Sequence, residues 1–188
     1  RPANLVGLST NVASETTALG DIFTDLSQAL SILPFEPRDE ERELYRFPLG
    51  DVPVSIAELC TAALPGMQSL CDGIERFHEL LSDAVAGNQD WEKAFEAEDW
   101  LLPVGQLQGR ALATLNLLQD YAQGVEQDHR CARWINRNQY DVEMVSAPIE
   151  PGHILSEVLW QRCYGCVCTS ATLTALGSFQ RFLERSGL

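Results

Sequence analysis

Apolar residues recur at helical spacing over the first third of the chain. Between positions 14 and 33 they follow one another at steps of three and four residues: Leu19, Ile22, Phe23, Leu26, Leu30 and Leu33. The residue before a proline disfavours the helical region, so we expect this helix to end at Pro34 or Pro37. The charged connection 34–51 is predicted to be a solvated loop or a helix face.

The middle of the chain predicts further helices. Residues 53–64 form a short helix that begins at a first-turn proline and is expected to end at Pro65-Gly66. Residues 67–86 carry one apolar stripe, and residues 101–125 repeat the pattern. Between them lie three aromatic residues at helical spacing, which we interpret as core rather than binding surface: Trp91, Phe95 and Trp100.

The pattern changes beyond position 127. Residues 132–137 and 142–149 alternate around a turn, which predicts a β-hairpin near 132–149. A short helix is expected over 153–162. The apolar run 163–171 is typical of a strand buried on both faces of a parallel sheet, and a last helix is expected over about 176–186.

These elements define a mainly α fold, followed by a strand and a helix of α/β type. A lone buried strand needs partner strands, and the rest of the sequence offers too few. The chain also begins without an initiator Met or a signal peptide, which favours a piece of a larger protein. No run of about 18 apolar residues predicts a membrane span.

Charge and cysteine usage bear on possible nucleic-acid contacts and on the redox compartment of the chain. Positions 1–99 hold nineteen Asp and Glu against six Lys and Arg, whereas positions 130–188 hold five against six. Such an acidic surface repels a nucleic-acid backbone on average, so any DNA contact is expected to be local. Six cysteines without the spacing of a disulfide scaffold favour a reducing cytoplasm.

The end of the chain resembles a known family. Residues 158–188 contain a Trp before the predicted strand, the tetrad Ser170-Ala171-Thr172-Leu173, and a terminal Ser-Gly-Leu. This arrangement resembles the DinG branch of the XPD-like, superfamily 2 DNA helicases, as does the segment from Arg46 to Pro53. The resemblance implies that 1–152 is a helical arch domain and that 153–188 is the C-terminal part of helicase domain 1.

The resemblance also implies a parent activity and cofactors. The parent would be a 5′-to-3′ ATP-dependent helicase acting on single-stranded or forked DNA in repair or replication. It would use ATP, Mg²⁺ and an iron–sulfur cluster bound outside this chain. By the same resemblance, Thr169, Ser170, Ala171 and Thr172 form motif III, which couples ATP hydrolysis to DNA movement.

The chain itself carries no complete catalytic motif. It contains neither a phosphate loop nor an Asp-Glu-x-His box, so we expect the isolated chain not to hydrolyse ATP. Cys163, Cys166 and Cys168, with His129, Cys131 and His153 as further candidate ligands, suggest a metal site, but ligands on a strand would point to opposite faces. We therefore interpret these thiols as buried apolar groups.

One basic cluster with an aromatic ring is a candidate DNA contact. Cations for phosphates beside a ring for base stacking are typical of single-strand binders, and the cluster consists of Arg130, Arg133, Trp134 and Arg137. Two alternatives stay open: a stand-alone acidic helical interaction protein that mimics nucleic-acid charge, and a metal-binding regulator based on the cysteine cluster.

Overall fold

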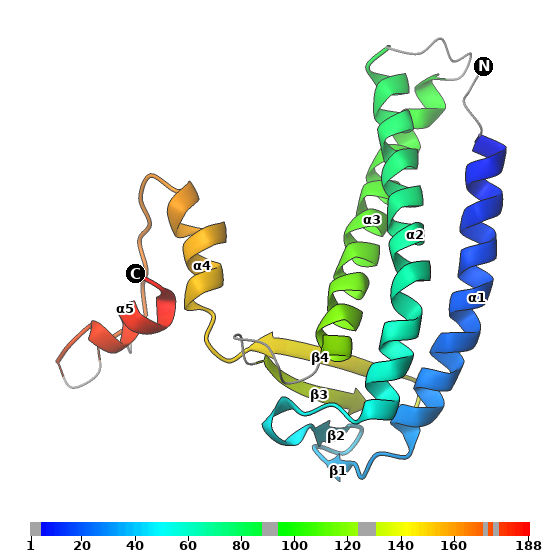
Figure 1. Ribbon diagram of the computed structural model, residues 1–188. Helices are drawn as coiled ribbons and strands as arrows, with labels where there is room; N and C mark the ends of the chain where they lie inside the picture. The colour runs from blue at the N-terminus through cyan, green and yellow to red at the C-terminus, as the bar shows by residue number, and fades with distance from the viewer. Residues whose placement is uncertain (1–4, 88–93, 124–130, 171–172, 175–176) are drawn as a thin grey trace.

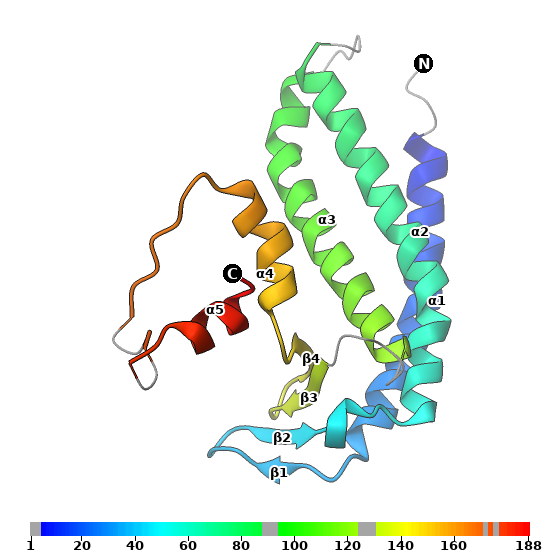
Figure 2. The ribbon, with the colours of Figure 1, turned by 60° about the vertical axis from the view of Figure 1, so that its left-hand side comes forward.

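The computed structural model describes residues 5–87, 94–123, 131–170, 173–174 and 177–188. Three long helices dominate it: α1 (Leu5–Ser31), α2 (Val54–Val85) and α3 (Ala94–Gln123). Helix α2 lies between the other two and packs against both (Figures 1 and 2). None of the described helices combines the length and the hydropathy that crossing a membrane requires.

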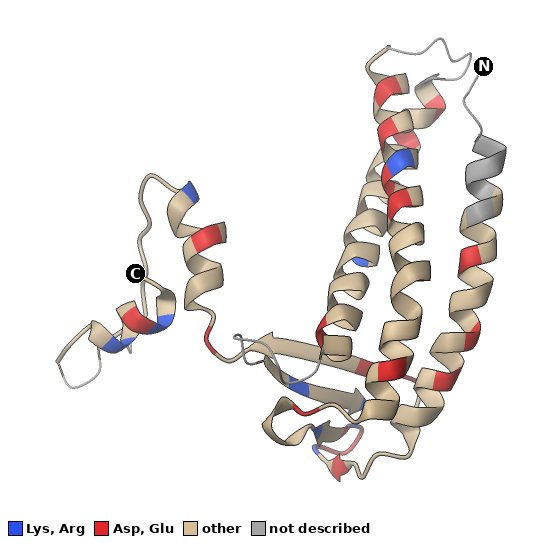
Figure 3. Cartoon of the chain, viewed as in Figure 1, with Lys and Arg blue, Asp and Glu red and all other residues tan. Residues whose placement is uncertain are grey.

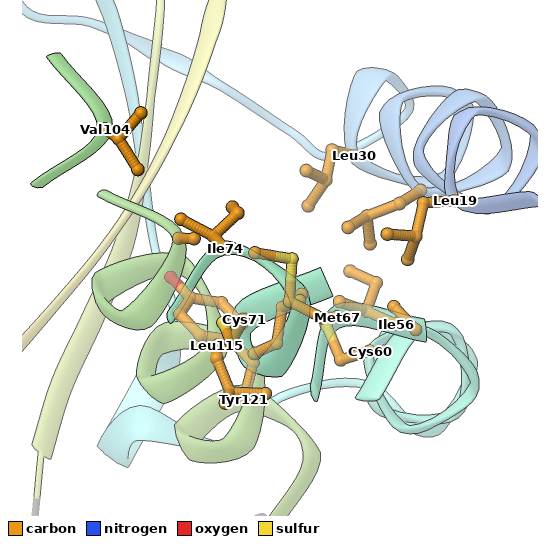
Figure 4. Packing of buried hydrophobic residues seen from close by; sticks show 14 of the residues in the cluster. Leu19, Leu30, Ile56, Cys60, Met67, Cys71, Ile74, Val104, Leu115 and Tyr121 are labelled. Carbon is orange, nitrogen blue, oxygen red and sulfur yellow. The ribbon is translucent and has the colours of Figure 1, made fainter. Parts of the chain in front are cut away.

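The core forms where α2 meets its neighbours. Its inward side chains include Ile56, Cys60 and Met67, all at most 4% exposed. They meet Leu19 of α1 and Leu115 of α3, as Figure 4 shows. Cys60 and Cys71 are buried in this interface as small apolar groups. Burying each large apolar side chain contributes about 1.5–3 kcal/mol, so this seam holds the three helices together.

Two predicted helix boundaries are wrong. Helix α2 continues through Pro65, where an end was predicted, and α3 begins at Ala94 instead of at position 101. An internal proline costs a helix about 3 kcal/mol or more, because its ring clashes and one amide donor is lost. Buried residues lie on both sides of Pro65, among them Ala63 and Met67, so the packing of a continuous helix offsets that cost.

A four-stranded antiparallel sheet lies at one end of the helices (Figure 1). Its strands are β1 (Glu36–Pro37), β2 (Glu43–Arg46), β3 (Cys131–Arg137) and β4 (Val142–Pro148), in that order. The predicted hairpin is confirmed as β3 and β4. Its turn is closed by Asn138, whose Oδ1 accepts hydrogen bonds from the amides of Tyr140 and Asp141.

The connection 34–51 differs from the prediction of a solvated loop or helix face. It forms β1, β2 and the 3₁₀ helix η1 (Pro48–Gly50). Leu44 and Tyr45 lie directly opposite Asn136 and Ile135 on β3. A strand of four residues becomes stable through that long-range pairing, which local charge does not reveal.

The last part of the chain forms a small separate module. Helix α4 (Gly152–Val158), the 3₁₀ helix η2 (Trp160–Arg162) and α5 (Gln180–Ser186) follow the sheet, and Figure 1 shows them away from α1–α3. The indole Nε1 of Trp160 donates a hydrogen bond to the carbonyl of Ser186 at 2.5 Å. The predicted helix over 153–162 is confirmed as α4 and η2, and α5 is shorter than predicted.

Candidate functional site

Strand β3 divides the predicted basic cluster between two faces of the sheet. Successive side chains of a strand point to opposite faces. Arg133 and Ile135 face the helices and are 5% and 0% exposed. Trp134, between them, faces away from the helices. Arg130 lies outside the described residues, so only part of the cluster can be placed.

Arg133 is held in place by a buried ion pair. Its Nε and Nη2 donate to the two carboxylate oxygens of Asp120 on α3 at 2.9 and 2.8 Å. Its Nη1 donates to the carbonyl of Gly50 at 2.8 Å. Arg133 on β3 thereby connects α3 and η1. Its guanidinium is buried by these contacts and exposes little surface to a phosphate.

The Asp120 carboxyl is tuned by this pairing. Burial acts to raise its pKa, but hydrogen bonds from Arg133 and Ser146 and the charge of Arg133 outweigh burial. The net result is a pKa below the usual value. The carboxylate is therefore ionised at neutral pH and serves the fold through its pairing with Arg133.

Tyr121 forms a second tie between α3 and the sheet. The side chain is fully buried, and its hydroxyl lies 3.1 and 2.9 Å from the carbonyl oxygens of Trp134 and Val145. Burial raises the pKa of this phenol far above its usual range. The hydroxyl therefore stays protonated and can donate to these carbonyls.

Arg137 is also engaged on the helix side of the sheet. Its Nε donates to Glu43 at 2.7 Å, and its Nη1 donates to the carbonyl of Ser31 at 3.2 Å. Its guanidinium lies 3.8 Å from the ring centroid of Phe35, a cation–π contact. The structure thus brings Arg133 and Arg137 to one face and Trp134 to the other.

The segment before the tetrad is extended and exposed. The prediction of a buried strand over 163–171 is wrong for the described residues 163–170, which form no strand. Tyr164 and Val167 are almost fully solvent-accessible, and Thr169 and Ser170 are exposed. Ala171 and Thr172 lie outside the described residues. Among the described strands none pairs with this segment, which agrees with the shortage of partner strands in the sequence.

Two of the three cysteines of this segment, Cys166 and Cys168, are exposed, in contrast to the prediction of buried thiols. The sulfur atoms of Cys166 and Cys168 lie 3.9 Å apart, and Cys163 is half-buried. Their mutual hydrogen bond raises the pKa of the Cys166 thiol. Across the described part of the chain, no three His, Cys, Asp or Glu side chains gather into a metal-binding group. His129 lies outside the described residues.

Two aromatic residues were also assigned wrongly to the core. Phe95 and Trp100 are 71% and 60% exposed on α3, and Trp91 lies outside the described residues. Helical spacing shows that residues share a face, whereas it does not show which face is covered. The sequence did not predict the contacts of Asp120, Tyr121 and Arg46, because their partners lie on other elements.

Comparison with curated proteins places the chain among longer relatives. It is 26% identical over 150 residues to "ATP-dependent DNA helicase DinG" of Photobacterium profundum, covering 77% of this chain and 21% of that protein. A protein of the same name from Salmonella choleraesuis is 26% identical over 171 residues, covering 89% of this chain and 23% of that protein.

A third relative carries a different name. The "3′-5′ exonuclease DinG" of Bacillus subtilis is 30% identical over 138 residues, covering 63% of this chain and 14% of that protein. No protein-family model matches the chain. The chain therefore spans less than a quarter of the length of each of these curated relatives.

Proposed function

From its distant similarity to part of the DinG helicases, we propose that this chain forms two adjoining parts of a longer DNA helicase. Residues 1–152 would be the arch-type domain, and residues 153–188 would be the C-terminal part of helicase domain 1. The parent would unwind DNA in the 5′-to-3′ direction during repair or replication. The relatives named as DNA helicases support a helicase-related role in DNA processing. The assignment of residue ranges to domains rests on sequence resemblance.

The observation that carries the proposal is the exposed segment 163–170. The apolar side chain of Val167 is 89% exposed there, although the sequence of the segment is typical of a buried strand. In the sequence, η2 directly precedes this segment and α5 follows it, and both helices pack against α4. Such a segment fits an element that completes a sheet supplied by another part of a longer protein.

We assign the binding sites for ATP, Mg²⁺ and the iron–sulfur cluster to parts of the parent protein that lie outside this chain. Phosphoryl transfer needs backbone amides, a Lys and a metal around the phosphates, and the sequence has no phosphate loop to provide them. The described cysteines do not fit a cluster either, since Cys60 and Cys71 are buried in the helix core and only two thiols lie close together.

Motif III is the part of this chain that would take part in coupling. Ser170 and Thr172 would exchange hydrogen-bond partners between the nucleotide site and the DNA-binding surface of the parent. Each such bond contributes about 1 kcal/mol, so small hydroxyl groups can switch between two states at low cost. Thr169 and Ala171 would keep the strand end in place.

The test compares coupling in the full-length protein. Replacing Ser170→Ala and Thr172→Ala should lower the number of base pairs unwound per ATP by several fold while single-stranded DNA still stimulates hydrolysis. Ser178→Ala, outside the tetrad, is the control. Unchanged unwinding per ATP in the double variant would refute the coupling role. ATP hydrolysis by this 188-residue chain alone would refute its assignment as a fragment.

The charge distribution favours a second candidate, a stand-alone acidic interaction protein. Asp and Glu residues are spread along the long helices, as Figure 3 shows, and most of the described ones are exposed. A mimic of nucleic-acid charge should compete with single-stranded DNA for a basic DNA-binding protein in a salt-dependent way. Such competition, without any unwinding by the full-length protein, would favour this candidate over the helicase.

A further inference from the structure

One face of the sheet is left uncovered by the helices. Residues on it alternate with the buried positions, and the strand register aligns them in rows across the sheet. Arg46 of β2 lies opposite Trp134 of β3, which lies opposite Val145 of β4. In the next row, Asn136 lies between Leu44, which pairs with Glu36 of β1, and Glu143 of β4. We call these seven residues, from two adjacent rows, the outer face.

The outer face has an apolar centre that does not belong to the core. Trp134 and Val145 are half-buried, and neither packs against the buried cluster between the helices and the sheet. Within the described part of the chain, all three long helices lie on the opposite side of the sheet (Figure 1). A Trp ring on an open sheet face is a surface on which a planar group can stack.

One cation, Arg46, lies beside this ring, and a second, Arg38, lies in the next row. Arg46 is exposed and, among the described residues, has no carboxylate at ion-pair distance. As the direct cross-strand neighbour of Trp134 it lies within about 5.5 Å of that residue's backbone. Arg38 reaches the next row, where its Nη1 donates to Oδ1 of Asn136 at 3.4 Å. The carboxylate of Glu143 accepts a hydrogen bond from Nδ2 of Asn136 at 2.8 Å.

We propose that the outer face binds single-stranded DNA, with one base stacked on Trp134 and the adjoining phosphates on Arg46 and Arg38. This inference rests on the proposed function and adds to it the surface that the strand contacts. Local charge selects DNA over an apolar partner, because Arg46 lies beside the ring and the two carboxylates of this face, those of Glu36 and Glu143, lie in the next row. The exposed acidic residues of the long helices lie on the other side of the sheet, so they repel the strand less there.

The test measures binding of a fluorescently labelled oligothymidylate to the 188-residue chain by anisotropy. Trp134→Ala should weaken the affinity by about tenfold, because stacking on one ring is lost. Trp134→Phe should retain most of it. Arg46→Gln should lower the slope of log affinity against log salt by about 0.7, the value for one phosphate of a single strand.

The control is a variant with the same charge change on the other face. Arg137→Gln removes a cation that is bound to Glu43 and Phe35 beneath the sheet, so it should leave both affinity and salt slope unchanged. An abasic oligonucleotide of equal length keeps the phosphates and lacks the bases. It should bind wild type and Trp134→Ala alike, provided that circular dichroism shows both to be folded.

Several outcomes would overturn the inference. They are unchanged binding in both Trp134→Ala and Arg46→Gln, equal losses in Arg46→Gln and Arg137→Gln, or no binding of the oligonucleotide by the wild-type chain at low salt. Each would leave the proposed helicase role intact, because that role is tested by unwinding per ATP in the full-length protein. Should Trp134→Ala fail to fold, the salt slope of Arg46→Gln decides alone.

Discussion

At the scale of single residues, the pairing of Asp120 with Arg133 is the contact on which most depends. Arg133 is 5% exposed and joins α3, β3 and η1, so removing its counter-ion leaves a buried charge without compensation. Asp120→Asn should lower the free energy of unfolding by about 3 kcal/mol, measured by urea denaturation. The double variant Asp120→Leu/Arg133→Met, which removes both charges, should lose less than the single variant. A single variant as stable as wild type would contradict this account.

The same pair predicts how stability depends on pH. The pKa of Asp120 is lower in the folded chain than its ordinary value of about 3.9. Stabilisation by an ionised carboxylate is therefore complete above that value and is lost as the pH falls through the folded pKa. The difference in unfolding free energy between wild type and Asp120→Asn should be constant from about pH 7 to 5 and shrink below about pH 4. A constant difference down to about pH 2.5 would show that ionisation of Asp120 does not stabilise the fold.

Residue types alone predicted only part of what the side chains of strand β3 do. Arg133, Trp134 and Arg137 read as one basic cluster, but a strand sends neighbouring side chains to opposite faces. Which face is covered depends on α3, whose Asp120 lies thirteen positions away from Arg133 in the sequence. The cross-strand neighbour of Trp134 is Arg46, and that pairing becomes visible only when the register is known.

At the scale of elements, the C-terminal module depends on a close approach of two glycines. A Cβ atom on Gly152 at the start of α4 would lie 2.9 Å from the amide nitrogen of Gly187 after α5. Gly152→Ala should separate the two helices and speed hydrogen exchange of the Gly187 amide and the Trp160 indole by about tenfold or more, followed by NMR. Gly165→Ala, at a position with open space around it, is the matched control. Equal exchange rates in the two variants would show that this glycine contact does not hold α4 and α5 together.

The sequence was most informative where an element buries a long periodic face. The alternation of β3 and β4 predicted these strands with nearly correct bounds. The apolar period of α1 predicted the end of that helix well, but α1 begins at Leu5, before the predicted start at position 14. Pro65 inside α2 misled the prediction, because local breaking rules do not include the packing gained by a continuous helix. The short strand β2 was missed since its stability comes from β3, about ninety positions away.

At the scale of the whole molecule, the exposed segment before the tetrad distinguishes this chain from the longer protein that we propose. Cys166 and Cys168 are exposed here, whereas burial raises the pKa of Cys60 to about 11. In the 188-residue chain, an aromatic disulfide reagent at neutral pH should therefore label Cys166 and Cys168 and leave Cys60 unmodified, because the reagent reaches the exposed sulfur atoms, whereas burial both shields Cys60 and disfavours its reactive thiolate form.

In the full-length protein the same two thiols should react at least tenfold more slowly, because a strand within a covered parallel sheet is shielded on both faces. Cys60 should stay unmodified in both proteins, which serves as the internal control for folding. Mass spectrometry of the labelled peptides assigns each site. Equal labelling of Cys166 and Cys168 in the two proteins would mean that the segment joins no sheet. The tetrad would then lie on a surface loop, where it has no strand to couple a nucleotide site to DNA.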